Sequence, residues 1–196
     1  MTVHIGVLAL QGDFREHVAM LRSLGADASE VRTVAELDRV DGLVIPGGES
    51  TTIGRLARIY GLIEPLRSRI GAGMPVLGTC AGMIFLGAAT TGPDQPQLGV
   101  LDVVVERNAF GRQIDSFEAD LDVTGLDAPM HAVFIRAPWI EKASGKVEVL
   151  ATVTAPGGDV HPVVVRQGHI LATSFHPELT DDTRVHELML AMVEAN

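Results

Sequence analysis

An apolar run that ends in a polar, glycine-bearing loop occurs three times in the first half of the chain, at residues 3–10, 41–45 and 74–77. A run that is apolar on both faces is typical of a strand in a parallel sheet that helices cover on both sides. Residues 27–31 are a further candidate for a short strand. Between the runs, apolar residues recur at helical spacing, which predicts helices over 14–24, 53–60, 62–70 and 83–88. This alternation of strand and helix is typical of a doubly wound α/β sheet.

The second half of the chain has a different pattern, in which short strand-like runs are separated by turn residues. We expect antiparallel hairpins here, added to the edge of the sheet or packed on it, and a last helix over 181–194. With 196 residues, one domain is the expected organisation. We therefore predict a flavodoxin-like, mostly parallel sheet with added hairpins in a single domain, 1–196. The predicted strands of this half are 100–105, 115–123, 132–135, 147–153, 160–166 and 169–174.

Composition excludes several classes of protein. The formal net charge is −10 and no basic run occurs, which argues against a nucleic-acid-binding protein. The apolar runs are all shorter than the ~18 residues that a membrane helix needs, and the first residues lack the basic segment of a signal peptide. A single cysteine allows no intrachain disulfide and is typical of a reducing compartment. We expect a soluble, cytoplasmic protein.

Three unusual loops follow predicted parallel strands, at residues 11–13, 46–50 and 78–82. Ligands of such sheets bind outside the carboxyl ends of the strands. The three loops should therefore meet at one edge of the sheet, whatever the order of the strands.

The third loop, Gly78-Thr79-Cys80-Ala81-Gly82, has the pattern of a nucleophile elbow with sulfur in place of oxygen. Small residues allow the sharp strand-to-helix turn to close, and the turn lifts the Cys80 side chain above the sheet edge. A nearby helix N-terminus favours the thiolate form. The alternative is a small buried cysteine without a chemical role.

A thiolate nucleophile needs a base, and the base needs an orienting partner. His176 follows a strand-like run, and Pro177 biases it away from helical backbone. Residues two apart in extended backbone point the same way, so Glu178 is placed to hold the His176 ring. The alternative is a polar turn leading into the last helix. His17 and His186 fall on predicted helices, where we expect surface positions.

The second loop suits acyl transfer. The backbone N–H groups of Gly48 and Ala81 can form an oxyanion hole, and Glu49 can receive a substrate ammonium. A phosphate-binding loop is a poorer match, because the segment lacks the Gly-Lys-Ser/Thr ending of a P-loop and the Gly-x-Gly-x-x-Gly of a dinucleotide site. The other alternative is a helix-capping turn with Ser50 as the cap, and such a cap is compatible with a functional role. Arg107 and Arg136 suit a carboxylate-bearing substrate, although surface ion pairing is the better explanation for either arginine taken singly.

No metal site is predicted. Asp13, a candidate N-cap of the first helix, and His17 stand at i and i+4, which is a weak metal pair without a third ligand.

Together these motifs resemble the class I (triad) glutamine amidotransferases and, more narrowly, the glutaminase subunits of pyridoxal 5′-phosphate synthases. The resemblance covers nearly the whole chain. Two stretches point to the pyridoxal branch in particular: Glu-Ser-Thr-Thr after the Pro-Gly-Gly turn, and Glu-Arg-Asn-Ala-Phe-Gly-Arg-Gln. The segments that carry it are 6–12, 46–52, 78–82, 105–113 and 174–180.

The resemblance implies a triad of Cys80, His176 and Glu178 that hydrolyses L-glutamine to glutamate and ammonia through a glutamyl thioester. It implies a synthase subunit, in a large hetero-oligomer, that uses the ammonia to build pyridoxal 5′-phosphate from ribose 5-phosphate and glyceraldehyde 3-phosphate. Pyridoxal phosphate is then a product of the complex, and the glutaminase needs no cofactor of its own. The implied glutamine contacts are Gly47, Gly48, Glu49, Arg107, Ile135 and Arg136.

The turn at Gln11 and Gly12 lies on the same predicted edge as the oxyanion loop, so we expect it to gate the site when the synthase docks. Three other interpretations stay open at this point. They are a cysteine hydrolase or stress protein on the same fold, a regulatory subunit without activity, and the glutaminase of another ammonia-using pathway.

Overall fold

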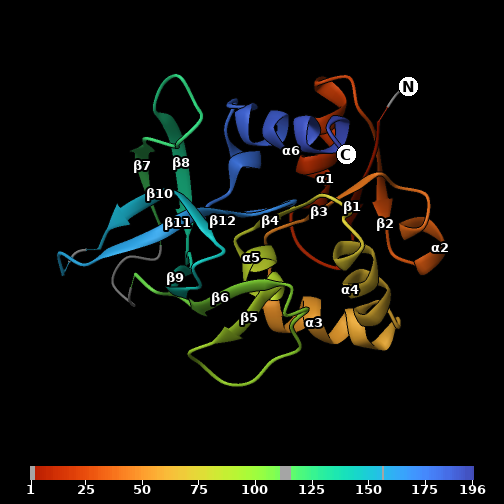
Figure 1. Ribbon diagram of the computed structural model, residues 1–196, viewed down its shortest axis with the longest axis horizontal. Helices are drawn as coiled ribbons and strands as arrows, with labels where there is room; N and C mark the ends of the chain where they lie inside the picture. The colour runs from red at the N-terminus through yellow and green to blue at the C-terminus, as the bar shows by residue number, and fades with distance from the viewer. Residues whose placement is uncertain (1–2, 111–115, 156) are drawn as a thin grey trace.

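A central sheet of seven strands organises the computed structural model, which describes residues 3–110, 116–155 and 157–196. The strands follow the order β10-β11-β12-β4-β3-β1-β2, and those from β12 to β2 are all parallel (Figure 1). The predicted mostly parallel sheet is confirmed. The parallel strands are β1 (His4–Leu8), β2 (Asp27–Val31), β3 (Gly42–Ile45), β4 (Val76–Thr79) and β12 (Ile170–Thr173).

Helices cover both faces of this sheet, as the continuous apolar strands require. Alternate residues of β3 divide between two cores: Leu43 and Ile45 join one cluster, and Val44 joins the other. The first cluster lies under α3 (Ser50–Ile59), α4 (Ile63–Gly71) and α5 (Ala81–Leu86). The second lies under α1 (Phe14–Ser23) and α6 (Arg184–Glu194), on the opposite side of the sheet (Figure 1).

The antiparallel strands of the second half lie in three places. The hairpin β10 (Glu148–Thr154) and β11 (Val160–Gln167) extends the main sheet beside β12. Two small sheets are separate from the main sheet: β7 pairs with β8 antiparallel, and β6 pairs antiparallel with β9 and parallel with the earlier strand β5. Both kinds of added hairpin were expected. The strands of the small sheets are β5 (Gly87–Thr90), β6 (Leu101–Glu106), β7 (Ser116–Leu121), β8 (Met130–Ile135) and β9 (Trp139–Ala143).

Several local predictions were wrong. Helix α5 begins at Ala81 rather than Met83, and it ends at Leu86 because the next residues pair with β6 as β5. Strand β9, which was not predicted, is held by antiparallel pairing with β6. The short helix α2 (Val34–Leu37) was also missed, although Thr33 and Glu36 form a capping box at its start. In each case, strand pairing or helix capping decided the structure, and the local pattern of apolar residues was too weak to predict it.

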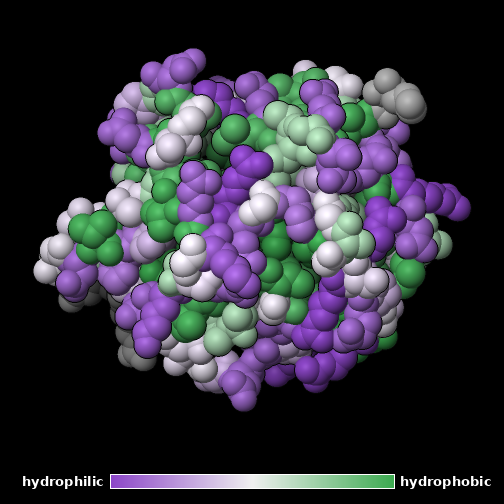
Figure 2. Space-filling view, viewed as in Figure 1, coloured by the Kyte–Doolittle hydropathy of each residue, from purple (hydrophilic) through white to green (hydrophobic). Residues whose placement is uncertain are grey.

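The outer surface mixes hydrophilic and hydrophobic residues on the face drawn in Figure 2. Among the described residues, no helix has the length and the apolar content that crossing a membrane would require.

Helix α5 packs very closely on β3. A Cβ atom on Gly82 would lie only 2.0 Å from the backbone oxygen of Ile45. By contrast, a Cβ on Gly71, at the end of α4, would meet no atom within 4 Å. These two helical glycines therefore have opposite roles: the first permits a close approach, and the second only costs helix propensity.

We expect Gly82→Ala to lower the free energy of unfolding by about 2 kcal/mol, because β3 and α5 must separate to admit the methyl group. Urea denaturation followed by circular dichroism measures this. The matched control Gly71→Ala should instead raise stability by up to about 1 kcal/mol, since alanine favours the helix. Equal effects of the two variants would contradict the close-packing argument.

Candidate active site

The three loops predicted to meet do line one cavity, at the carboxyl ends of β1, β3 and β4. Its volume is about 690 Å³. Gly12 and Gly47 stand just behind its wall, and Glu178 lies behind His176. The sequence-predicted residues that line the cavity are Gln11, Gly48, Glu49, Cys80, Ala81, Arg107, Ile135, Arg136 and His176.

Cys80 occupies a strained turn between β4 and α5. Its backbone has φ 47° and ψ −103°, a conformation that L-residues rarely adopt. A Cβ on Gly78 would lie 2.5 Å from Leu86 and 2.9 Å from the backbone carbon of Gly82, so the turn closes only around glycine. The Cys80 N–H donates to the Thr173 carbonyl oxygen at 2.8 Å, which ties the turn to β12. The thiol is largely buried but faces the cavity.

His176 and Glu178 are joined by a hydrogen bond of 2.7 Å between Nδ1 and Oε1. His176 has φ −105° and ψ 87°, a non-helical conformation such as a residue before proline favours, and the chain then enters a 3-10 turn, η1 (Pro177–Leu179), rather than continuing as a strand. The turn brings Glu178 back against the ring and buries its carboxylate completely. Asp13 Oδ2 lies 3.5 Å from the same Nδ1, so two carboxylates face this nitrogen.

Burial lowers the pKa of His176, but hydrogen bonds to Cys80 and Glu178, together with their charges, outweigh it and raise the pKa to about 10. Burial raises the pKa of Glu178, and the hydrogen bond and charge of His176 oppose that rise. Since Nδ1 is held by Glu178, the other ring nitrogen is the one left for the thiol. The arrangement can hold a thiolate beside an imidazolium, which is the reactive form of a cysteine nucleophile.

The turn at Gln11 and Gly12 packs directly on the loop after β3. Gln11 Oε1 accepts a hydrogen bond of 2.6 Å from the backbone N–H of Glu49. A Cβ on Gly12 would lie 1.7 Å from the Gly47 carbonyl oxygen, so only glycine fits there. Gly48 has φ 147°, a conformation that also favours glycine. The conformation of this loop is therefore coupled to that of the turn.

Glu49, and not Ser50 as predicted, is the N-cap of α3. Its carboxylate accepts hydrogen bonds from the backbone N–H groups of Thr51 and Thr52 at 3.1 and 2.7 Å. Burial raises the pKa of Glu49, but these bonds and those of the threonine hydroxyls outweigh it, so the net pKa is lowered. Arg107 Nη2 lies 3.3 Å from Glu49 Oε1. The two side chains therefore neutralise each other at the cavity rim, and a ligand would have to share them.

The first helix begins after Asp13, but the Asp13 side chain makes no capping bond and turns toward His176 instead. Gly111, Arg112 and Gln113, the last residues of the segment 105–113 that carries the resemblance, lie outside the described residues.

The prediction that His17 and His186 lie at the surface was wrong, because both side chains are fully buried. The signal was present in the sequence. His17 stands three residues after Phe14 and four before Leu21, on the apolar stripe of α1, and His186 stands three residues before Met189 of α6. His17 is bonded to Thr79 and His186, so it does not pair with Asp13 as metal ligands would.

Asp13, His176 and Glu178 each bring a potential metal-ligating atom within 4.8 Å of the others. A metal ion there would have to break the hydrogen bond between His176 and Glu178. The donor set is therefore better matched to orienting an imidazole than to holding an ion.

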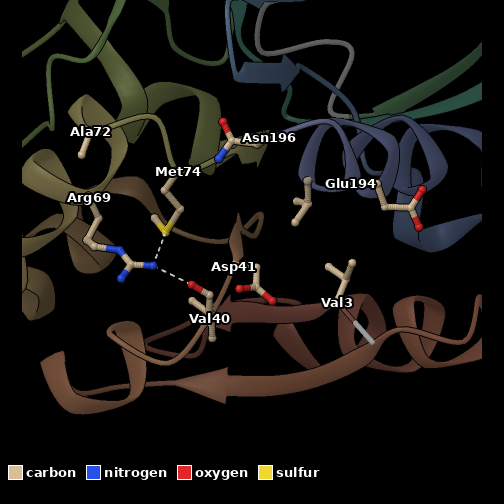
Figure 3. A pocket seen from close by; sticks show the side chains of 9 residues that line it. Val3, Val40, Asp41, Arg69, Ala72, Met74, Glu194 and Asn196 are labelled. Atoms are coloured by element: carbon tan, nitrogen blue, oxygen red, sulfur yellow. Dashed lines mark hydrogen bonds between the residues drawn. The ribbon is translucent and has the colours of Figure 1, made fainter. Parts of the chain in front are cut away.

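A second hollow, of about 780 Å³, lies at the opposite, amino-terminal ends of β1, β3 and β4. Arg69 at its wall donates to the Val40 carbonyl oxygen and to the Met74 sulfur (Figure 3). The Arg69 guanidinium therefore has a structural role, because it links the segments that contain Val40 and Met74. Among the described residues that line this hollow there is no cysteine or histidine, and so no thiol or imidazole for catalysis.

The raised pKa of His176 predicts that its ring stays protonated at pH 8, where an ordinary histidine is neutral. Proton NMR titration of the ring signals measures this. Cys80→Ala should lower the pKa of His176, because it removes the partner that favours the charged ring. Stability linked to this proton should be complete below about pH 6.5 and should fall as pH rises toward about 10. An unchanged titration in the variant would contradict the thiol–imidazole pairing.

Comparison with known proteins agrees with this geometry. The model of the SNO glutamine amidotransferase family matches residues 7–195. A protein of Parafrankia sp. (strain EAN1pec), named pyridoxal 5′-phosphate synthase subunit PdxT, is 62% identical over 97% of this chain and 93% of its own length. A protein of the same name from Mycobacteroides abscessus is 59% identical over the full length of both chains.

The chain is also similar to solved structures. A crystal structure described as a glutamine amidotransferase superposes with a TM-score of 0.90 at 53% identity, covering 97% of this chain and 98% of the other. A chain from the structure of PurLQS from Thermotoga maritima, 16% identical, superposes with a TM-score of 0.72 over 97% of this chain and 99% of its own, and shows the fold alone. The chain belongs to the SNO glutamine amidotransferase family.

Proposed function

We propose that the chain is the glutaminase subunit of a pyridoxal 5′-phosphate synthase. The observation that carries the proposal is the strained Cys80 turn, in one cavity with a His176 ring that Glu178 holds. The names of relatives at about 60% identity over nearly the whole chain support the pathway.

In the proposed reaction, the Cys80 thiolate attacks the side-chain carboxamide carbon of L-glutamine. His176 donates its proton to the departing nitrogen, which leaves as ammonia, and a glutamyl thioester remains on the sulfur. His176, now neutral, takes a proton from water as the water attacks the thioester, and glutamate leaves. Glu178 stays ionised and stabilises the imidazolium at each stage.

The backbone N–H groups of Gly48 and Ala81 are the proposed oxyanion hole, since both residues line the cavity beside the thiol. We assign glutamine binding to the cavity rim. Glu49 and Arg107 carry the opposite charges that the ammonium and carboxylate of an amino acid need, and they already neutralise each other at 3.3 Å. The remaining proposed contacts are Gly47, Gly48, Ile135 and Arg136.

The proposed partner is a synthase subunit that accepts the ammonia and forms pyridoxal 5′-phosphate from ribose 5-phosphate and glyceraldehyde 3-phosphate. The glutaminase described here then needs no cofactor. The proposal places it in the cytoplasm, where reducing conditions keep the Cys80 thiol free. The glutaminase of another ammonia-using pathway would have the same triad and would differ in the protein that accepts its ammonia.

The proposal predicts that Cys80→Ala abolishes pyridoxal phosphate synthesis from glutamine in the complex. Synthesis from ammonium salts should remain, because the synthase then bypasses the thioester. The measurement is pyridoxal phosphate absorbance, with glutamate release followed in parallel. Glutamate release without pyridoxal phosphate in the wild-type complex would keep the glutaminase and exclude this pathway.

A second prediction separates a glutaminase from other cysteine hydrolases. L-Glutamine should protect Cys80 from iodoacetamide, because a glutaminase binds this substrate over its thiol. Protection is measured by mass spectrometry, with L-leucine as the control ligand. Labelling that glutamine does not slow would favour a different hydrolase on the same fold.

We also propose that the Gln11–Gly12 turn gates the site. Its contact with the Glu49 N–H couples it to the oxyanion loop, and docking of the synthase would reset both. Glutamate release by the isolated glutaminase should then be at least about tenfold slower than in the complex. Equal rates would rule out gating and leave the triad assignment intact.

A further inference from the structure

A buried chain of polar side chains continues behind the triad. His17 on α1 and His186 on α6 are both fully buried, and their Nδ1 and Nε2 atoms are 2.8 Å apart. His17 Nε2 lies 3.2 Å from Thr79 Oγ1 and 3.3 Å from Glu178 Oε2. Glu178 uses its other oxygen for His176, and no hydrogen bond of regular geometry reaches its Oε2.

Both histidines are neutral. Burial lowers the pKa of His17 well below its usual value, and the repulsion that a protonated His17 would meet from a protonated His186 or His176 lowers it further. Burial alone lowers the pKa of His186 to about 4. Each ring therefore carries a single N–H, and its position decides which neighbour receives a hydrogen bond.

The contacts select one arrangement of these hydrogens. If His17 carried its hydrogen on Nδ1, its Nε2 lone pair would face the anionic Glu178 Oε2 at 3.3 Å. His186 would then hold its hydrogen on Nδ1, which is buried with no partner. With the hydrogens on both Nε2 atoms, His186 donates to His17 Nδ1. The His17 Nε2–H then donates to Thr79 Oγ1, while its nitrogen stays 3.3 Å from Glu178 Oε2. Only this second arrangement avoids the repulsion at Glu178 Oε2 and a buried ring N–H without a partner, and it leaves His186 Nδ1 as an unpaired acceptor.

We propose that His17 is a positioning residue, whose Nε2–H faces Glu178 Oε2 and keeps that carboxylate ionised and aimed at His176, with His186 fixing the His17 tautomer. The inference deepens the proposed function, because it concerns the same triad. It makes α1 and α6 part of the catalytic arrangement, although neither helix touches Cys80 or a substrate through these side chains.

The groups that face the Glu178 carboxylate come from several elements. His176 binds Oε1, and Asp13, at the start of α1, adds a like charge that raises the pKa of Glu178. Thr79 on β4 is uncharged. His17 Nε2 lies 3.3 Å from the Glu178 oxygen that has no hydrogen-bond partner among the described residues. Loss of that N–H should therefore raise the pKa of Glu178, because a polar hydrogen beside a buried charge would be removed.

The test compares His17→Gln with His17→Asn. The glutamine amide nitrogen can reach the position of the histidine Nε2, whereas the asparagine amide reaches only the position of Nδ1, beside His186. The two variants thus differ by one methylene group and by the contact with Glu178. The readout is the rate of Cys80 alkylation by iodoacetamide as a function of pH, which reports how well the ionised Glu178 supports the thiolate–imidazolium pair.

We expect the acid limb of the alkylation profile to move to higher pH by about one to two pH units in His17→Asn. His17→Gln should stay within about half a unit of wild type. In the complex, kcat for glutamine should fall about tenfold in His17→Asn with KM nearly unchanged, because ground-state binding does not involve His17. Equal profiles for the two variants would overturn the proposal.

Leu21→Ala is the control for a merely structural effect. Leu21 is fully buried one turn after His17 on α1, so its truncation lowers stability without touching Glu178. It should leave the pH of the acid limb unchanged. A shift as large as that of His17→Asn would show that loosening α1 is enough, and the proposal would then be wrong.

Wild-type protein offers a measurement that depends on no variant's folding. Nitrogen-15 NMR of the histidine rings should show His17 and His186 as neutral Nε2–H tautomers. An Nδ1–H tautomer at His17 would overturn the inference. Both this spectrum and the alkylation profile are recorded without glutamine, so failure of the glutaminase assignment would appear separately, as absent glutamate release by the wild-type complex.

Discussion

The geometry of the site follows from how closely α5 approaches β3. The Ile45 carbonyl oxygen occupies the space where any side chain at Gly82 would begin. Because α5 can lie this close, the chain turns sharply at Cys80 and adopts a positive φ there. The turn aims the thiol into a cavity whose opposite wall is the loop after β3. One missing Cβ thus sets the distance between the nucleophile and the loop that would hold the oxyanion.

The site depends, besides the close approach of α5 to β3, on the burial of the Glu178 carboxylate. A desolvated carboxylate is costly unless its oxygens are paired. His176 pairs with one oxygen at 2.7 Å, and His17 stands 3.3 Å from the other. The same pairing that offsets the cost of burial also holds the His176 ring in place. Stability and chemistry are therefore coupled at this carboxylate, and a change behind it would reach the thiol through His176.

Much of this arrangement could be predicted from local patterns. Apolar runs locate the parallel strands, and the loops after them meet in one cavity because parallel strands end at the same edge. The spacing of glycines around Cys80 predicts an elbow. The capping role of Glu49 was missed, because Ser50 is the commoner cap type and only the local geometry shows which residue reaches the Thr51 and Thr52 amides. Strand β9 was missed because its order comes from pairing with β6.

The apolar strand runs and the elbow follow from the order of the amino acids alone, because each depends on neighbours within a few residues. The sequence favours extended backbone through Glu178, and the structure shows instead the 3-10 turn η1 that brings Glu178 back to His176. The burial of His17 and His186 together behind Glu178, 169 positions apart in the chain, is settled by tertiary packing. The place of each histidine on the apolar stripe of its helix favours burial. What each ring contacts once it is buried depends on what the sheet places opposite it, and for His17 that is the Glu178 carboxylate.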